Sequence, residues 1–254
     1  GGGSSVSASY KAGTYNPPVG AYQVLMSQIG RHVIALGTTD INSTTINPLN
    51  VRWSSSETLG TWEALSTNSA GGQELSLGSE IIGGLSTRQE VLIWTDAGVV
   101  AMRYVGSPFY FSFTEVARGM SMVSPNAAVN ANGRVFFMDR GDFYTYTGSV
   151  QKLNCTVLTT VFDDFDSTQS HKVVSGSNPD FSEAMWFYPS ASGDGEIDRY
   201  VIYNYEDQIW YTGSLVRGTW NQADTKTYPL ATSIIKNDLA DNPLTTNTSS
   251  TSNV

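Results

Sequence analysis

Short apolar runs separated by turn residues follow one another along most of the chain. The runs are rich in β-branched and aromatic side chains, which favour extended backbone, and residues 109–113 place phenylalanine at every second position. That alternation is typical of a strand with one buried face. The clearest runs cover residues 33–36, 91–94, 99–105, 135–138, 143–146, 184–188, 200–203 and 209–211. The pattern predicts an all-β chain.

Turn residues stand between these runs where hairpins would need them. Asn132-Gly133 is a strong signal for a tight hairpin, and residues 96–98 and 194–195 also carry turn chemistry. Residues 139–142 contain an Arg-Gly-Asp triplet between two apolar runs. We interpret this triplet as a hairpin turn in which Gly141 supplies a positive φ, and not as an adhesive motif.

The apolar runs recur in units of similar length. Strands expected to begin near Val33, Val91, Val135 and Ala184 are separated by 58, 44 and 49 residues (91−33, 135−91 and 184−135). A four-stranded propeller blade takes roughly 40–50 residues. The spacing therefore predicts four blades, as a β-propeller or a propeller-like array of antiparallel blades, either closed or incomplete within this chain. A β-sandwich is the alternative fold.

One segment departs from the strand pattern. Residues 157–165 carry apolar side chains at helical spacing, and Asn154 could cap the helix. The acids Asp163, Asp164 and Asp166 then lie at its C-terminal end. A calcium loop needs alternating ligands and a glycine, which this cluster lacks. We predict one short helix between two blades, with a solvated acidic end and no bound metal.

The two ends differ in composition from the body. Residues 1–20 are rich in Gly and Ser and contain Pro17 and Pro18, so we expect an extended arm. The start resembles the middle of a longer polypeptide or a linker. Residues 21–236 are expected to form the β-propeller-like body, and residues 237–254 a polar tail that is extended or disordered. No apolar run approaches the roughly 20 residues of a membrane-spanning helix.

Charge limits the classes of partner. The formal net charge is −9, and only 15% of residues are charged. A surface that grips DNA or RNA needs clustered lysine and arginine, which this balance disfavours. An acidic surface would suit a channel through which nucleic acid passes without specific binding, although ordinary solubility is the simpler explanation of the charge and the one we favour.

Residues for enzyme chemistry are scarce. Cys155 is the only cysteine, and His32 and His171 are the only histidines. A disulfide within the chain is therefore impossible, a Cys/His metal site is not expected, and a serine nucleophile would have few candidate bases. Phosphate-binding loops and dinucleotide fingerprints are absent from the sequence. We predict no enzyme activity, no catalytic residues, no metal and no cofactor.

Residues 55–62 resemble the Asp-box turn of sialidase-type propellers. Glu57 stands where that turn has aspartate, Gly60 is displaced by one place, and Trp62 would pack between strands. A sialidase also needs an arginine cluster and a tyrosine nucleophile with a glutamate partner. The tyrosines of the strands are instead expected to pack in the core; they are Tyr144, Tyr146, Tyr200 and Tyr203.

Several short motifs occur in the order in which they occur in one family of virion proteins. They cover residues 50–54 and 61–62, 92–96, 105–109, 125–129, 132–133 and 198–205. On these motifs the chain resembles the tail hub or nozzle (tail tubular) proteins of short-tailed bacteriophages. The resemblance spans about residues 33–230 and implies a β-propeller body, a sixfold ring below the portal or adaptor, and a central passage for DNA. Beyond Pro229 the chain departs from the family pattern.

We therefore expect a structural protein of the virion tail. It would form a homo-oligomeric nozzle or hub ring, dock the portal or adaptor and the tail-fibre proteins, and let DNA pass during ejection. The alternative is a carbohydrate-binding or sialidase-like propeller that recognises the host surface. That alternative would use exposed Trp62, Trp210 or Trp220 as platforms on which sugars stack.

Overall fold

The computed structural model describes residues 16–221 and 229–232. Strands dominate, and the described helices are α1 (Leu158–Asp164) and two 3-10 segments, η1 (Ser167–Lys172) and η2 (Pro179–Phe181). The prediction of an all-β chain with one short α-helix is confirmed. The described part of the chain contains no helix long and apolar enough to cross a bilayer. The predicted tail at 237–254 and most of the predicted arm lie outside the described residues.

Four antiparallel sheets of four strands each follow one another along the chain, and in each sheet sequence neighbours are also spatial neighbours. We call them blades one to four. Blade one holds β1 (Ala21–Met26), β2 (Val33–Thr38), β3 (Asn50–Trp53) and β4 (Gly71–Glu74). Blade two holds β5 (Ile81–Ser86), β6 (Glu90–Thr95), β7 (Gly98–Gly106) and β8 (Tyr110–Arg118).

Blades three and four repeat the same meander. Blade three holds β9 (Ala128–Ala131), β10 (Arg134–Met138), β11 (Phe143–Tyr146) and β12 (Val150–Lys152). Blade four holds β13 (Val174–Asn178), β14 (Glu183–Pro189), β15 (Ile197–Asn204) and β16 (Ile209–Ser214). A further hairpin of β17 (Thr219–Asn221) and β18 (Leu230–Thr232) follows blade four.

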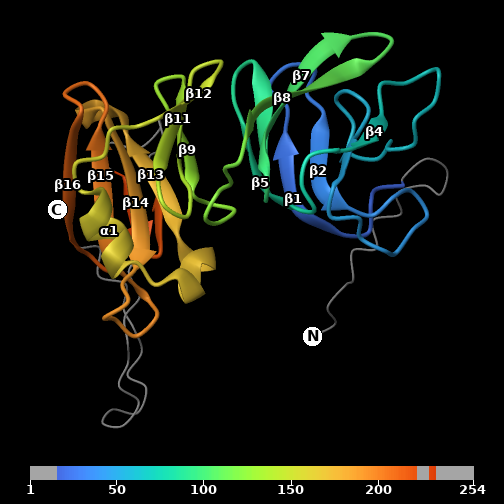
Figure 1. Ribbon diagram of the computed structural model, residues 1–254. Helices are drawn as coiled ribbons and strands as arrows, with labels where there is room; N and C mark the ends of the chain where they lie inside the picture. The colour runs from blue at the N-terminus through green and yellow to red at the C-terminus, as the bar shows by residue number, and fades with distance from the viewer. Residues whose placement is uncertain (1–15, 222–228, 233–254) are drawn as a thin grey trace, which may run out of the picture.

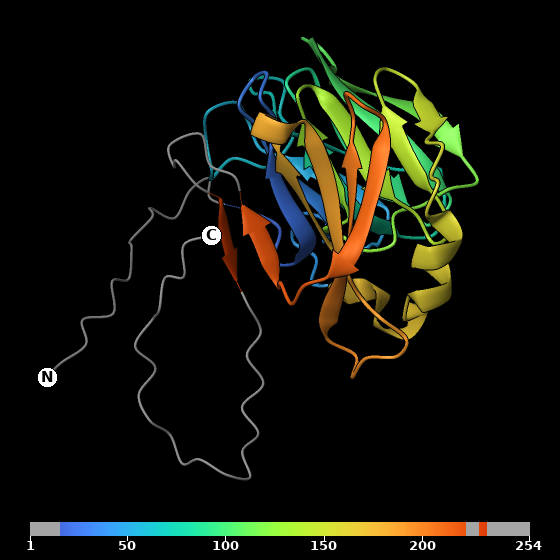
Figure 2. The same ribbon diagram turned by 90° about the vertical axis from the view of Figure 1, so that its left-hand side faces the viewer.

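The blades stand face to face in a propeller-like array (Figure 1). The first strand of each blade contacts the first strand of the next, from β1 to β5, β5 to β9 and β9 to β13. The hairpin, dark orange in Figure 2, continues this series because β17 packs beside β13. Among the described residues no comparable packing leads from β13 or β17 back to β1. The array therefore continues past blade four into the β17–β18 hairpin, and the described residues do not close it into a ring with blade one.

The predicted repeat has the right length but the wrong starting point. The first strands begin at residues 21, 81, 128 and 174, which are separated by 60, 47 and 46 residues (81−21, 128−81 and 174−128). The apolar runs from which we predicted the blades are second strands. A second strand lies inside the sheet with both faces covered, so nearly every residue of β6 is buried. First strands are less apolar, because β1 has a half-exposed face and β5 contains two glycines.

Aromatic side chains fill the spaces between blades. Trp94 of blade two meets Phe137 of blade three edge to face at 5.3 Å between ring centroids. Phe143 of blade three lies 4.9 Å from Trp186 and also 4.9 Å from Trp210 of blade four. These large rings bury much apolar area, the main stabilising contribution in a protein of this size.

Blade one approaches blade two closely at Gly84 of β5. A Cβ at this position would lie 2.6 Å from Leu36 Cδ1, so only glycine fits without a shift. Across this close contact, the side-chain amide of Gln23 on β1 forms two hydrogen bonds with the backbone of Gly84. Gln23 Nε2 donates to the Gly84 carbonyl at 3.1 Å, and the Gly84 N–H donates to Gln23 Oε1 at 2.6 Å. The Gln23 side chain thereby links β1 to β5 through one donor and one acceptor, as the backbone of a paired strand would.

Helix α1 forms where predicted but is capped differently. Its N-cap position is Val157, which makes no side-chain capping bond, so the expected cap at Asn154 is wrong. The Asn154 carbonyl instead accepts a hydrogen bond from Trp210 Nε1 at 3.0 Å. Within this irregular stretch the backbone satisfies a buried indole, and the helix starts later. Tertiary packing has overridden the local capping signal.

The acids at the end of α1 have separate partners. Asp164 pairs with Arg199 Nε of β15 at 3.0 Å, which ties the helix to blade four. Asp166 accepts hydrogen bonds from the Thr168 hydroxyl and backbone N–H, and these lower its pKa. Asp166 therefore caps η1, and Asp163 is exposed. All three acids remain at least partly exposed, and two of them also have protein partners.

The hairpin turns agree with the sequence in place and partly in conformation. Asn132 and Gly133 both have positive φ (51° and 78°), as the tight hairpin requires. The Arg-Gly-Asp triplet lies in the β10–β11 turn, closed by a hydrogen bond from Asp139 N–H to the Asp142 carbonyl at 2.9 Å. The expected positive φ at Gly141 is wrong, because this turn does not use the left-handed region there.

Candidate functional site

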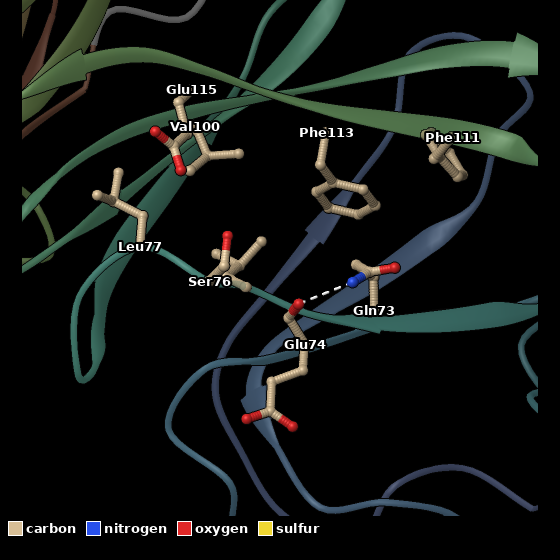
Figure 3. A pocket seen from close by; sticks show the side chains of 9 residues that line it. Gln73, Glu74, Ser76, Leu77, Val100, Phe111, Phe113 and Glu115 are labelled. Carbon is tan, nitrogen blue, oxygen red and sulfur yellow. Dashed lines mark hydrogen bonds between the residues drawn. The ribbon is translucent and has the colours of Figure 1, made fainter.

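A groove opens between the outer strands of blades one and two. Its volume is about 350 Å³, and its walls come from β4 and the residues after it on one side and from β7 and β8 on the other (Figure 3). The lining residues are Gln73, Glu74, Leu75, Ser76, Leu77, Val100, Phe111, Phe113 and Glu115.

The floor of the groove is apolar because β8 alternates. Phe111, Phe113 and Glu115 share the face of β8 that looks toward blade one, and Val100 of β7 lies beside them. Phe111 contacts Trp53 of blade one edge to face at 5.2 Å. The predicted alternation fails at Phe109, which precedes β8 and is 78% exposed. β8 extends well beyond the four-residue β4, and this difference in length leaves the groove open.

The other wall is a sheet edge. β4 is the last strand of blade one and pairs on one side only, with β3. Leu75 continues that pairing, since its N–H donates to the Leu49 carbonyl at 3.0 Å. On its opposite edge, no strand of the described residues pairs with β4. Gln73 Nε2 donates to the Glu74 carbonyl at 2.8 Å, the bond drawn in Figure 3. An unpaired edge beside an apolar floor is suited to an added strand.

The rim of the groove is acidic. Glu74 is exposed and forms no ion pair within the described ranges. Glu115 accepts a hydrogen bond from Arg118 Nε at 2.7 Å, so its charge is partly compensated. The groove therefore favours an extended ligand that carries apolar groups on one side and positive charge at the rim.

A second polar cluster lies between blades two and three. Tyr146 of β11 donates to Glu90 Oε1 at 2.6 Å, and Arg103 Nε contacts Glu90 Oε2 at 2.6 Å. Burial, together with the bond to Glu90, raises the pKa of Tyr146 to about 12. A tyrosine beside a glutamate and an arginine has the composition of a sialidase nucleophile, but this hydroxyl is buried and strongly disfavours ionisation. The cluster acts as a clamp between two blades.

The residues considered for metal binding or nucleophilic catalysis do not lie close to one another. His32 is fully buried, with Nδ1 2.7 Å from the Ser54 carbonyl, and is surrounded by aromatic rings. His171 lies in η1, and burial raises the pKa of the half-buried Cys155 thiol. Over residues 16–221 and 229–232 no three His, Cys, Asp or Glu side chains form a group that could hold a metal ion.

The tryptophans proposed as sugar platforms are covered. Trp62 and Trp210 are only 4% and 6% exposed, and Trp62 Nε1 donates to the Leu59 carbonyl at 2.9 Å. Trp220 is half-buried, stacks on Phe187 at 6.1 Å and donates to the Ser177 carbonyl. The expectation that these rings are exposed is therefore wrong for the first two, and Trp220 is already engaged.

Blade one ends the array with an apolar face that no other described strand covers. Along β1, Tyr22, Val24 and Met26 point away from blade two and are 53%, 61% and 56% exposed. The alternate residues Gln23 and Leu25 face blade two. The corresponding surfaces inside the array are covered by the next blade. The sequence shows only a short apolar run here, so the uncovered row was not predicted.

Comparison with known proteins identifies no family. No family model matches the sequence, and no curated protein matches it. Among solved structures, the chain is similar to a "Putative exported protein" from Bacteroides fragilis NCTC 9343, with 11% identity and a TM-score of 0.38. The alignment covers 76% of this chain and spans 57% of the length of that protein. Similarity of this degree carries no argument about function.

Proposed function

We propose that the chain is a structural protein of a bacteriophage tail, which forms a nozzle or hub ring through the ends of its blade array. One observation carries this proposal: the row of Tyr22, Val24 and Met26 on β1 is apolar and more than half exposed. In a blade array such positions are normally buried against the next blade. A contiguous apolar row left in water favours a protein contact.

The two ends of the array present different surfaces. Blade one ends in the apolar row on β1, whereas the other end carries the β17–β18 hairpin beside blade four. A contact between unlike surfaces of two copies is head-to-tail, and repetition of such a contact gives a ring when the rotation closes. The open array is therefore suited to ring assembly.

The finer parts of the proposal rest on the sequence. The motif series resembles nozzle proteins of short-tailed phages, which implies a sixfold ring between the portal or adaptor and the fibres. The net charge of −9 suits a passage that DNA crosses without specific binding, because phosphates are repelled. The tail of the virion would be the site of action.

The mass of the native particle tests the proposal. Mass photometry of the full chain should give a closed ring, and Val24→Asp should dissociate it by placing a charge in the apolar row. Val105→Asp is a matched control, since Val105 is as exposed but lies on β7. A chain that stays monomeric at high concentration, even with tail proteins added, would contradict ring assembly.

A carbohydrate-binding function keeps one supporting observation. Phe113 stands in the groove, which Gln73 and Glu115 also line, and these are side-chain types that sugar sites use. A glycan array probed with the full chain tests this second candidate. Binding that Phe113→Ala abolishes would favour the carbohydrate function, and an array without binding would exclude it for the glycans used.

A further inference from the structure

We infer that the tip of the β7–β8 hairpin binds lipid, by placing Phe109 in the interfacial region of an uncharged, zwitterionic bilayer. Ile29 of the β1–β2 turn and Phe181 of η2 belong to the same surface, which we call the apolar end of the array. This inference goes beyond the proposed function, because it needs no contact between copies of the chain.

Phe109 stands at the tip of a projecting hairpin. β7 and β8 have nine residues each and are the longest of the described strands, and their hairpin extends outward at the upper end of Figure 1. Phe109 is 78% exposed, more than any other large apolar side chain in the described ranges. A phenyl ring held in water gains free energy when an apolar phase covers it.

The backbone at the tip turns the Phe109 ring outward. Tyr110 has a φ of 59°, a left-handed conformation that bulky residues rarely adopt. Across it, the Phe111 N–H donates to the Phe109 carbonyl at 2.7 Å. The rings of Tyr110 and Phe111 lie against the buried His32, at 6.4 Å and 5.1 Å between ring centroids. A rare backbone conformation that presents an apolar ring to solvent points to a functional contact.

A second apolar side chain lies beside the base of the hairpin. The β1–β2 turn packs against β7, since a Cβ on Gly30 would lie 3.0 Å from Tyr104 Cε2. Ile29 in this turn is 42% exposed. Blades one and two therefore present apolar side chains from neighbouring turns.

Phe181 lies at the same end because blades two, three and four share one orientation. Tyr146, which precedes the β11–β12 turn, donates to Glu90, which follows the β5–β6 turn. A parallel bridge joins Asn126 to Val174, so β9 and β13 start side by side and also end on the same side. Phe181 follows β13 and is 66% exposed. Helix α1 lies at the opposite end (Figure 1).

Charge favours a zwitterionic bilayer as the partner. Residues 104–114 contain no charged side chain, so the tip can enter the interface without desolvating an ion. The chain carries a net charge of −9, which anionic lipids would repel. Protruding apolar side chains on separate blades also suit an extended surface better than a single pocket. Binding would then depend on the apolar area inserted and not on ion pairs.

Flotation of the full chain with phosphatidylcholine vesicles tests the inference. Phe109→Ser should weaken binding about 10-fold, the order expected when one phenyl ring is lost from an apolar environment, and Phe181→Ser by a smaller factor. Binding should persist at high salt and weaken when phosphatidylserine is added. Val19→Ser is the matched control, because Val19 is 73% exposed and precedes β1, at the end opposite the β1–β2 turn. Absence of binding, or equal losses in Phe109→Ser and Val19→Ser, would overturn the inference.

A fluorescent label reports on insertion directly. In a Cys155→Ser background, an environment-sensitive dye on Ser107→Cys should shift its emission to the blue on vesicles, because Ser107 is exposed beside Phe109. The same dye on Gly141→Cys, in an exposed turn at the opposite end, should not shift. Equal shifts at both sites, or none, would overturn the inference. If Phe109→Ser changes the mass of the native particle but not vesicle binding, the tip is a protein contact instead. A ring of normal mass that does not bind vesicles would overturn the lipid contact and leave the proposed function standing.

Discussion

Single residues decide how closely the blades approach one another. Gly84 allows Leu36 and Leu25 of blade one to lie where a Cβ would otherwise stand, and its backbone exchanges two hydrogen bonds with Gln23. Between blades two and three, the Glu90 carboxylate holds both Tyr146 and Arg103. The contact between blades one and two depends on the missing side chain of Gly84. The contact between blades two and three depends on Glu90, whose two carboxylate oxygens each accept a hydrogen bond.

Gly84→Ala should destabilise the fold by about 1–3 kcal/mol, since the added methyl overpacks the space between β1 and β5. Urea unfolding monitored by tryptophan fluorescence gives this free energy. Gly141→Ala is the matched control, because nothing lies within 4 Å of a Cβ there and its φ is not positive. Equal stability of the two variants would contradict the close approach at Gly84.

Tyr146→Phe should cost about 1–3 kcal/mol because it leaves a buried carboxylate oxygen of Glu90 without its donor. Differential scanning calorimetry measures the loss. Tyr22→Phe provides the comparison, since the Tyr22 ring is half-exposed on β1 and should change stability little. If both variants melt together, the hydroxyl of Tyr146 contributes nothing to the clamp.

At the scale of elements, the β17–β18 hairpin depends on one tryptophan. Trp220 packs against Gly176 of β13, where a Cβ would come within 2.6 Å of the indole, and it stacks on Phe187 of β14. The hairpin itself has three residue pairs, too few for independent stability. The hairpin is therefore held by the packing of Trp220 on blade four and not by its own strand pairing.

Trp220→Ala should release the hairpin from blade four while the four blades stay folded. Hydrogen exchange should show protection of the β17 and β18 amides falling by at least about tenfold, which corresponds to roughly 1.4 kcal/mol. Leu230→Ala is the control, since Leu230 is exposed on β18. Unchanged exchange in Trp220→Ala would mean that other contacts hold the hairpin.

At the scale of the whole molecule, burial of tyrosines links stability to alkaline pH. Burial raises the pKa of Tyr146 and of Tyr188 from 10.0 to about 12. Because the folded pKa lies above the unfolded value, this stability is fully present below pH 10 and is lost as the pH rises toward 12. The loss is on the order of 2 kcal/mol for each residue.

An absorbance titration at 295 nm should therefore show part of the tyrosines ionising together with unfolding between pH 10 and 12. Tyr188→Phe removes one raised group and should make the fall in stability with pH less steep. Tyr211→Phe is the control, since Tyr211 is exposed on β16. Normal ionisation of every tyrosine near pH 10 in a folded chain would contradict this prediction.

The sequence by itself determined the all-β class, the approximate repeat, the short helix and the place of the Asn132-Gly133 turn. Each of these depends on local pattern: alternation, helical spacing, or a backbone conformation that few residues adopt. The apolar runs also identified the second strand of each blade, because this strand is covered on both faces in every blade.

Only the tertiary structure decided where each blade begins, which face of β1 stays uncovered, and that β4 and β8 enclose a groove. These features depend on which surfaces meet, and the alternation of a strand does not say what lies opposite either face. The same reason explains Trp62 and Trp210, which a sequence can present as exposed rings but which loops and a neighbouring blade bury. The start of α1 was likewise decided by tertiary packing. The Asn154 carbonyl accepts a hydrogen bond from the buried indole of Trp210, and the helix begins after Val157 without a side-chain cap. A buried donor without an acceptor costs more free energy than a missing helix cap.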